Sequence, residues 1–187
     1  MTRFIAFCAV ALLTAPVAAL QRQGTQGDPD KMAKAGSGLP SGWNARLDSG
    51  STKIDGVNLM AMGAGFHFIT GPAGIYYKLT DQAMGAYETH ATFTQVEPSA
   101  HPEAYGLIIG GSGLDGPNQK YTYFLIRQDG MFLVKRRAGA QTPTVTNWTG
   151  HAAVKKPDAS GKMTNTLSID VGKDTVRFLV KDRKSVV

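Results

Sequence analysis

The stretch that most constrains the fold of this chain covers residues 121–137 and reads YTYFLIRQDGMFLVKRR. Two runs of β-branched, aromatic and other apolar residues flank the dipeptide Asp129-Gly130. Asp-Gly between two such runs is the strongest short-range signal for a β-hairpin, because a two-residue type I′ turn needs positive φ at both positions. The sequence therefore predicts strands over residues 121–128 and 131–137, joined by a tight two-residue turn.

A two-residue turn also predicts which side chains share a face. Gln128 would oppose Met131, and side chains would alternate between the two faces along each strand. One predicted face is apolar and resembles a core, with Phe124, Ile126, Met131 and Leu133. The other is mixed, with Tyr121, Tyr123, Leu125, Arg127, Phe132, Val134 and Arg136. The mixed face would suit a shallow binding surface, although a covered or half-solvated sheet face is the commoner explanation.

The rest of the chain contains further short runs of the same kind. Strands are predicted over residues 42–48, 57–62, 65–70, 73–79, 85–96, 105–109, 165–171 and 175–180. Val, Ile, Thr, Tyr and Phe dominate these runs, as is usual for pleated surfaces. Residues 138–162 are rich in Pro, Thr, Gly and Lys and are predicted to form a long loop with one apolar anchor, Trp148. About ten short strands without a convincing helix indicate an all-β sandwich or barrel.

The N-terminal sequence MTRFIAFCAVALLTAPVAA has the pattern of a secretory signal peptide, with Arg3 before an apolar run and small residues up to Ala19. Residues 1–19 are therefore predicted to be removed near Ala19, and the mature protein to be periplasmic or secreted in a bacterial setting. The cysteine, Cys8, lies within this signal, so the mature chain would have no thiol for a disulfide or a metal site. Residues 20–41 are polar and aperiodic and are predicted to form a disordered leader before one domain, residues 42–187.

The charge of the chain is moderately basic. It has 20 Lys and Arg against 14 Asp and Glu, a net charge of +6, and the basic residues are spread out apart from short runs such as Lys135-Arg136-Arg137 and Lys155-Lys156. Nucleic-acid binding would call for a basic patch within a recognisable module, and export argues against it. The charge is interpreted as favouring solubility and attraction to anionic surfaces. No nucleic-acid partner, cofactor, metal site or integral membrane segment of the mature chain is predicted.

A small set of polar residues would suit acid–base chemistry. Glu88 and His90 are two apart on the predicted strand 85–96 and would point the same way, and His67 lies on another strand. They would bind a metal or act as acid and base, although polar residues on a solvated face are the commoner explanation. A glycosidase needs two carboxyl groups about 5–9.5 Å apart. Glu88 has no acidic neighbour two or four positions away, which argues against direct glycoside hydrolysis.

Several segments together resemble a known superfamily: GWNARLD, MGAGFHFITGPAGIYY, EAYGLIIGG and YTYFLIRQDGMFLVKRRAG. From residue 42 to about residue 180 the chain resembles the concanavalin A-like lectin/glucanase superfamily. Within it, the chain is similar to exported bacterial jelly-roll domains grouped with 3-keto-disaccharide hydrolase-like domains. The resemblance implies an antiparallel jelly-roll sandwich with a concave face, which receives sugar in many relatives. No catalytic set of that superfamily maps onto this chain residue by residue.

Three functions follow as hypotheses. The leading one is a non-catalytic domain that binds carbohydrate or an envelope glycan on its concave face. Its candidate ligand-binding residues are Tyr123, Arg127, Arg136, Glu88, His90 and His67. The first alternative is an enzyme that cleaves glycosidic bonds in modified disaccharides, with Glu88 and His90 as general base or metal ligands. The second is a structural or interaction domain of the cell envelope.

The C-terminal residues carry a separate expectation. The predicted strands 165–171 and 175–180 should pair, because the three-residue connection Gly172-Lys173-Asp174 is short. Four charged residues then follow Val180, and only three residues remain beyond them. In the similar domains one or two further strands return at this point. The sequence predicts no full strand ending at Val187, so that the fold either closes early or is truncated at its C-terminus.

Overall fold

A computed structural model describes residues 38–48, 54, 57–69, 73–180 and 184–185. The elements within these residues are β-strands, with no α-helix among them, which confirms the all-β fold class. None of the described residues belongs to a helix that is long and apolar enough to cross a membrane. The predicted signal peptide and most of the predicted leader lie outside the described residues. Gly38, which the leader was predicted to include, forms an isolated parallel bridge with Asn58.

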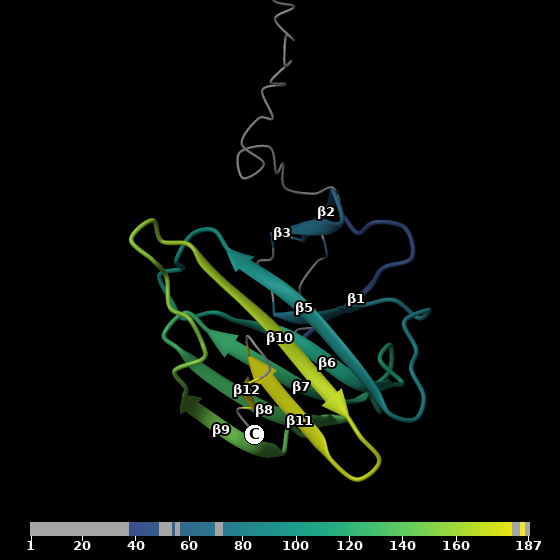
Figure 1. Cartoon of the computed structure of the whole chain (residues 1–187). Helices are drawn as coiled ribbons and strands as arrows, with labels where there is room; N and C mark the ends of the chain where they lie inside the picture. Colours follow the sequence, from purple (N-terminus) through teal and green to yellow (C-terminus); the bar gives the residue numbers. More distant parts are fainter. Residues whose placement is uncertain (1–37, 49–53, 55–56, 70–72, 181–183, 186–187) are drawn as a thin grey trace, which may run out of the picture.

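Two four-stranded antiparallel sheets lie over one another, consistent with a β-sandwich (Figure 1). The front sheet has the order β12-β11-β10-β5, and the back sheet has the order β6-β7-β8-β9. The strands are β5 Tyr87–Gln95, β6 Ala104–Ser112, β7 Lys120–Arg127, β8 Met131–Ala138, β9 Thr144–Gly150, β10 Met163–Val171, β11 Val176–Val180 and β12 Lys184–Ser185. The names front sheet and back sheet follow the view in Figure 1.

Two smaller antiparallel sheets come first in the chain. They pair β1 with β4 and β2 with β3, and their strands are β1 Asn44–Leu47, β2 Asn58–Met62, β3 Gly65–Ile69 and β4 Gly74–Tyr77. Edge-on ring contacts join them, with centroids 5.1 Å apart for Trp43 and Phe66 and 4.4 Å apart for Phe68 and Tyr76. Residues 70–72, between β3 and β4, lie outside the described residues.

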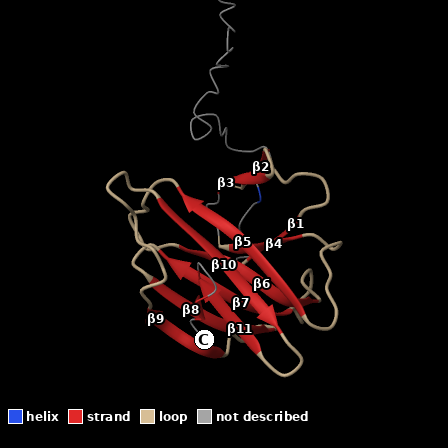
Figure 2. Ribbon diagram, in the orientation of Figure 1, coloured by secondary structure: helices blue, strands red, loops and turns tan. Residues whose placement is uncertain are grey.

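The core lies between the front and back sheets (Figure 2). Its buried members are Phe124, Ile126, Phe132 and Val134 from the back sheet, Leu167, Ile169, Phe178 and Val180 from the front sheet, and Val154. Each strand contributes every second residue, which is the period of a strand with one buried face. In β5, the predicted alternation is confirmed: Glu88 and His90 are exposed, whereas Thr89 and Ala91 are half-buried.

The β7–β8 hairpin forms as predicted, but its turn is one residue longer. Ile126 pairs with Phe132, so residues 128–130 form the turn. The Gly130 amide donates to the Arg127 carbonyl at 3.1 Å, and Gly130 has φ 87°. A turn followed by a left-handed glycine is the common three-residue hairpin connection, which also uses Asp-Gly. The prediction of a two-residue type I′ turn was therefore wrong.

The longer turn moves every residue of β8 to the opposite face from the one predicted. A register slip of one residue has this effect because side chains alternate with a period of two. Phe132, Val134 and Arg136 lie on the core side of β8, and Met131 and Leu133 lie on the outer side. The observed register places Phe132 and Val134, with 2% and 0% exposure, in the core.

Strand β9 was not predicted, because its residues were assigned to the long loop 138–162. The segment TVTNWTG does carry a strand signal, since Thr, Val and Trp are favoured in sheets. It was obscured by Pro143 before it and by Gly150 at its end. β9 is an edge strand of the back sheet, and its pairing with β8 is irregular between Phe132 and Lys135.

The C-terminal strands pair as predicted. β10 and β11 form an antiparallel pair that runs from Leu167 opposite Val180 to Val171 opposite Val176. The two residues of β12 pair with the end of β11. Residues 186–187 lie outside the described residues, so that part of the prediction stays a prediction.

Candidate functional site

The residues predicted to form one site lie on two faces of the sandwich. Tyr123 and Arg127 lie on the outer side of the back sheet, because their neighbours Phe124 and Ile126 enter the core. Glu88 and His90 lie on the outer side of the front sheet, and the core separates the two pairs. The sequence analysis grouped all four as ligand-binding residues of one face, but β5 and β7 belong to different sheets.

Two further predicted residues lie elsewhere. Arg136 was predicted to share a face with Tyr123 and Arg127, but the hairpin register places it on the other face of β8. Its backbone amide donates to the carbonyl of Pro143 at 2.9 Å, near the end of the strand. His67 lies opposite Met60 in the small β2–β3 sheet. Neither residue joins the two outer faces described below.

The outer side of the back sheet, here called the outer back face, carries the largest group of aromatic and basic side chains that the sequence pointed to. It consists of Tyr121, Tyr123, Leu125 and Arg127 of β7, Met131, Leu133, Lys135 and Arg137 of β8, and Trp148 of β9. The sequence analysis missed Lys135 and Arg137 because of the register error. It noted Trp148 only as a loop anchor.

Arg127 is held firmly at one end of this face. Its guanidinium carbon lies 4.2 Å from the centroid of the Trp148 ring, a cation–π contact. Its Nε and Nη2 atoms donate to Asp129 Oδ1 and Oδ2 at 3.2 and 2.5 Å, and Nη2 also lies 2.9 Å from the Met131 sulfur. The hydrogen bond from Arg127 is the main cause that lowers the pKa of Asp129. These contacts fix the position of the planar Arg127 cation relative to the aromatic ring of Trp148.

Two tyrosines occupy the other end of the face. The rings of Tyr121 and Tyr123 lie 5.7 Å apart, and Tyr121 is buried whereas Tyr123 is half-buried. Burial raises the pKa of both hydroxyls, while the nearby cation of Arg137 lowers it by a smaller amount. Both hydroxyls therefore stay protonated at neutral pH and are able to donate hydrogen bonds.

The outer side of the front sheet carries a group that the sequence analysis only partly identified. Glu88 lies directly opposite Asp170 in the β5–β10 pair. Arg177 Nη2 donates to Asp170 Oδ2 at 2.9 Å, and His90 Nδ1 lies 4.0 Å from Glu88 Oε1. Glu88, Asp170 and Arg177 line a shallow hollow of about 390 Å³. Glu88, His90, Asp170 and Arg177 are here called the front acid cluster.

The sequence analysis found no acid two or four positions from Glu88 and did not consider Asp170, on the later predicted strand 165–171. The outward orientation of Asp170 could be predicted from the sequence, because Asp170 alternates with the apolar residues Leu167 and Ile169 on a predicted strand. What the sequence did not show is that this strand pairs with β5. Among the described residues, no three His, Cys, Asp or Glu side chains come together as a metal site.

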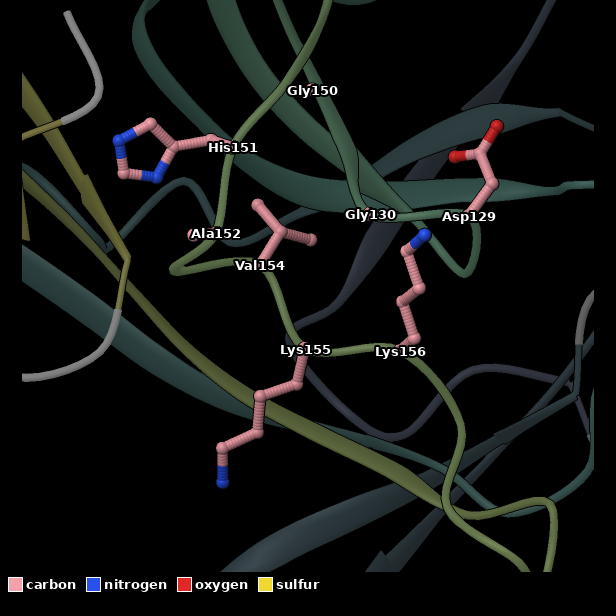
Figure 3. Close-up of a pocket in the computed structure, with 8 residues that line it drawn as sticks. All are labelled: Asp129, Gly130, Gly150, His151, Ala152, Val154, Lys155 and Lys156. Carbon is pink, nitrogen blue, oxygen red and sulfur yellow. The ribbon is translucent and has the colours of Figure 1, made fainter.

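A second shallow hollow, of about 450 Å³, lies beside the β7–β8 turn (Figure 3). Its lining is Asp129, Gly130, Gly150, His151, Ala152, Val154, Lys155 and Lys156. In Figure 3 the Lys156 side chain extends toward the turn, whereas Lys155 and His151 point away from it. The hollow adjoins the Arg127 end of the outer back face through Asp129, to which Arg127 is bonded.

Comparison of the chain with protein-family models, with curated proteins and with solved structures found no match. The outer back face and the front acid cluster are therefore interpreted from their own geometry and chemistry.

Proposed function

We propose that this protein is an exported, non-catalytic β-sandwich of the jelly-roll, concanavalin A-like type that binds a glycan on its outer back face. The observation that carries the proposal is the cation–π contact of Arg127 with Trp148, with Tyr123 on the same face. A sugar ring has a C–H face that packs on aromatic rings and a rim of hydroxyls that pair with polar groups. Binding sites commonly combine aromatic lining with a few well-placed polar groups.

The rigidity of the Arg127–Trp148 pair supports this role. Asp129 already holds the guanidinium with two hydrogen bonds, so little side-chain freedom remains to be lost when a ligand binds. Trp and Tyr offer large contact areas with one polar group each. The face of the Trp148 ring that Arg127 does not cover would provide the stacking surface, and Arg127 and Tyr123 would provide donors to ring hydroxyls and ring oxygens.

Replacement of Trp148 by alanine should weaken glycan binding about tenfold or more, as expected for a central aromatic contact. A glycan array first identifies ligands, and calorimetric titration of the best of them measures the affinity. Trp43→Ala is the matched control, because Trp43 lies in the segment before β1 and contacts Phe66. This control should leave the affinity unchanged.

A spectroscopic version of the same experiment avoids dependence on folding yields. Trp43→Phe leaves Trp148 as the only tryptophan of the chain, since the sequence contains two. Its emission should then change when a glycan is added. A folded protein that binds no glycan, or a Trp148→Ala variant that binds as tightly as the wild type, would refute the proposal.

The front acid cluster supports a second candidate function, hydrolysis of a glycosidic bond in a modified disaccharide. The observation that supports it is that Glu88 and Asp170 lie directly opposite one another on the paired strands β5 and β10 and line a hollow. Directly opposite Cβ atoms lie about 4.5–5.5 Å apart, and carboxyl pairs of glycosidases lie about 5–9.5 Å apart. Arg177 would orient the Asp170 carboxylate, and His90 would lie beside Glu88.

For this second candidate, the expected result is turnover of a disaccharide that falls about 100-fold or more in Glu88→Gln and in Asp170→Asn. Product release is followed by chromatography with unmodified and 3-keto disaccharides as substrates. Glu97→Gln, a change of the same type at an exposed position after β5, should leave turnover intact. Turnover that survives both cluster variants would exclude the cluster as the catalytic site.

A further inference from the structure

The strands of the two sheets differ in charge. The residues of the back-sheet strands β6, β7, β8 and β9 include no Asp or Glu, but they include the cations Lys120, Arg127, Lys135, Arg136 and Arg137. The front-sheet strands balance Glu88 and Asp170 against Arg177 and Lys184. The excess positive charge of the sandwich therefore lies on the sheet that carries the outer back face.

Three of these cations lie on the outer back face itself. Arg127, Lys135 and Arg137 occupy alternate positions that point to the outer side of β7 and β8. The Nε atom of Arg137 is buried and has no hydrogen-bond partner among the described residues. The Arg137 cation acts on the hydroxyls of Tyr121 and Tyr123, lowering their pKa against the effect of burial.

Few carboxylates oppose these cations. Asp129 is engaged by Arg127 through two hydrogen bonds. Asp48, just after β1, raises the pKa of Tyr121 and Tyr123, but Arg46 of the same strand acts on Tyr121 in the opposite direction. Asp48 therefore offsets part of the positive charge of Arg137 at the Tyr121 end of the face.

The hollow beside the turn extends the positive charge at the Arg127 end. Lys155 and Lys156 both line it, and Asp129 is its acidic member (Figure 3). The Lys155 backbone amide donates to Asn165 Oδ1 at 2.9 Å, and Asn165 is buried in β10. This bond anchors the segment that carries the two lysines to the front sheet. From Met131 to Arg137, β8 spans about 20 Å, which is the length of several sugar units, and cations lie near both of its ends.

We infer that the glycan bound by the outer back face is a polysaccharide with anionic groups, carboxylate or sulfate, on its sugar units. The inference rests on the proposed function of that face. Aromatic rings and Arg127 would receive the sugar rings, while Lys135, Arg137 and Lys156 would pair with the anionic groups. Arg and Lys cations form stronger hydrogen bonds to anionic than to neutral acceptors.

The test uses the full chain with four polymers and one vesicle as probes: polygalacturonate, heparin, neutral dextran, duplex DNA and vesicles of phosphatidylglycerol. Polygalacturonate or heparin should bind at least tenfold more tightly than dextran, and binding should weaken as salt rises, because exposed charges are screened. Comparison of the affinities for polygalacturonate and for heparin shows whether carboxylate or sulfate is the recognised group.

Two double variants locate the binding. Lys135→Gln with Arg137→Gln should weaken binding of the acidic glycan about tenfold or more. Lys155→Gln with Lys156→Gln should weaken it severalfold, and this surface variant keeps the test valid if the first variant folds poorly. The matched control, Lys162→Gln with Lys173→Gln, removes the same charge at exposed positions outside the back sheet and should bind as the wild type does.

The possible outcomes separate this inference from the proposed function. Dextran bound as tightly as the acidic glycans would overturn the inference and leave the proposed function standing. A folded protein that binds none of the glycans would overturn the proposed function. DNA or vesicles bound as tightly as the acidic glycans, with no change in Trp148→Ala, would reveal charge attraction alone and would also overturn the inference.

Discussion

Phe132→Ala should lower the free energy of unfolding by about 3–5 kcal/mol, as is typical when a buried aromatic ring is truncated. Phe132 is 2% exposed, and its ring centroid lies 6.4 Å from that of Phe124 and 6.2 Å from that of His151. Its neighbour Met131 is only half-buried and lies on the outer side of β8. Met131→Ala should therefore cost about 1 kcal/mol, near the average for single substitutions.

Equilibrium unfolding in urea measures both costs, with the denaturant slope m monitored so that only stability is compared. The pair of variants tests the hairpin register directly. With a two-residue turn, Met131 would lie in the core and Phe132 on the outer side. A larger loss in Met131→Ala than in Phe132→Ala would therefore contradict the three-residue turn.

Gly106→Ala is expected to have the largest effect of all, a loss of at least about 3 kcal/mol or a failure to fold, because overpacking against backbone is not relieved by side-chain movement. A Cβ atom at Gly106 would lie 1.9 Å from the carbonyl oxygen of Phe124 on β7. To accommodate it, β6 would have to separate from β7, although Gly106 pairs with Leu125 there. Circular dichroism and thermal unfolding measure the loss.

Gly150→Ala provides the matched control for this substitution. Gly150 ends the edge strand β9, and a Cβ atom there would meet no atom within 4 Å. Its stability should change by no more than about 0.5 kcal/mol, the usual range for surface positions. Equal losses in the two glycine variants would show that the close packing of β6 on β7 does not decide the effect.

Most strands could be predicted from the sequence because their residues alternate with a period of two and carry strand-forming side chains. The β7–β8 connection shows the limit of such reasoning. Asp129-Gly130 suits both a two-residue and a three-residue turn, and the choice between them decides which face Phe132 joins. Burial of Phe132 and Val134 against the front sheet settles the register, and this information lies in residues far along the chain.

The candidate site was less predictable than the fold for the same reason. Arg127 and Tyr123 were identified because they lie within one hairpin. Trp148 joins them only because β9 pairs with β8, and Asp170 faces Glu88 only because β10 pairs with β5. A single sequence gives little indication of which distant strands pair or in what register.

The irregular β9 edge of the back sheet affects whether copies of this protein associate through their sheet edges. An edge strand with a regular ladder offers unpaired backbone groups to a strand of another molecule, which promotes aggregation. The pairing of β9 with β8 is broken twice, between Phe132 and Val134 and between Val134 and Lys135. Irregularities of this kind twist an edge away from the flat shape that a second strand needs. The β9 edge of one copy would therefore not pair with the β9 edge of another to form a shared sheet.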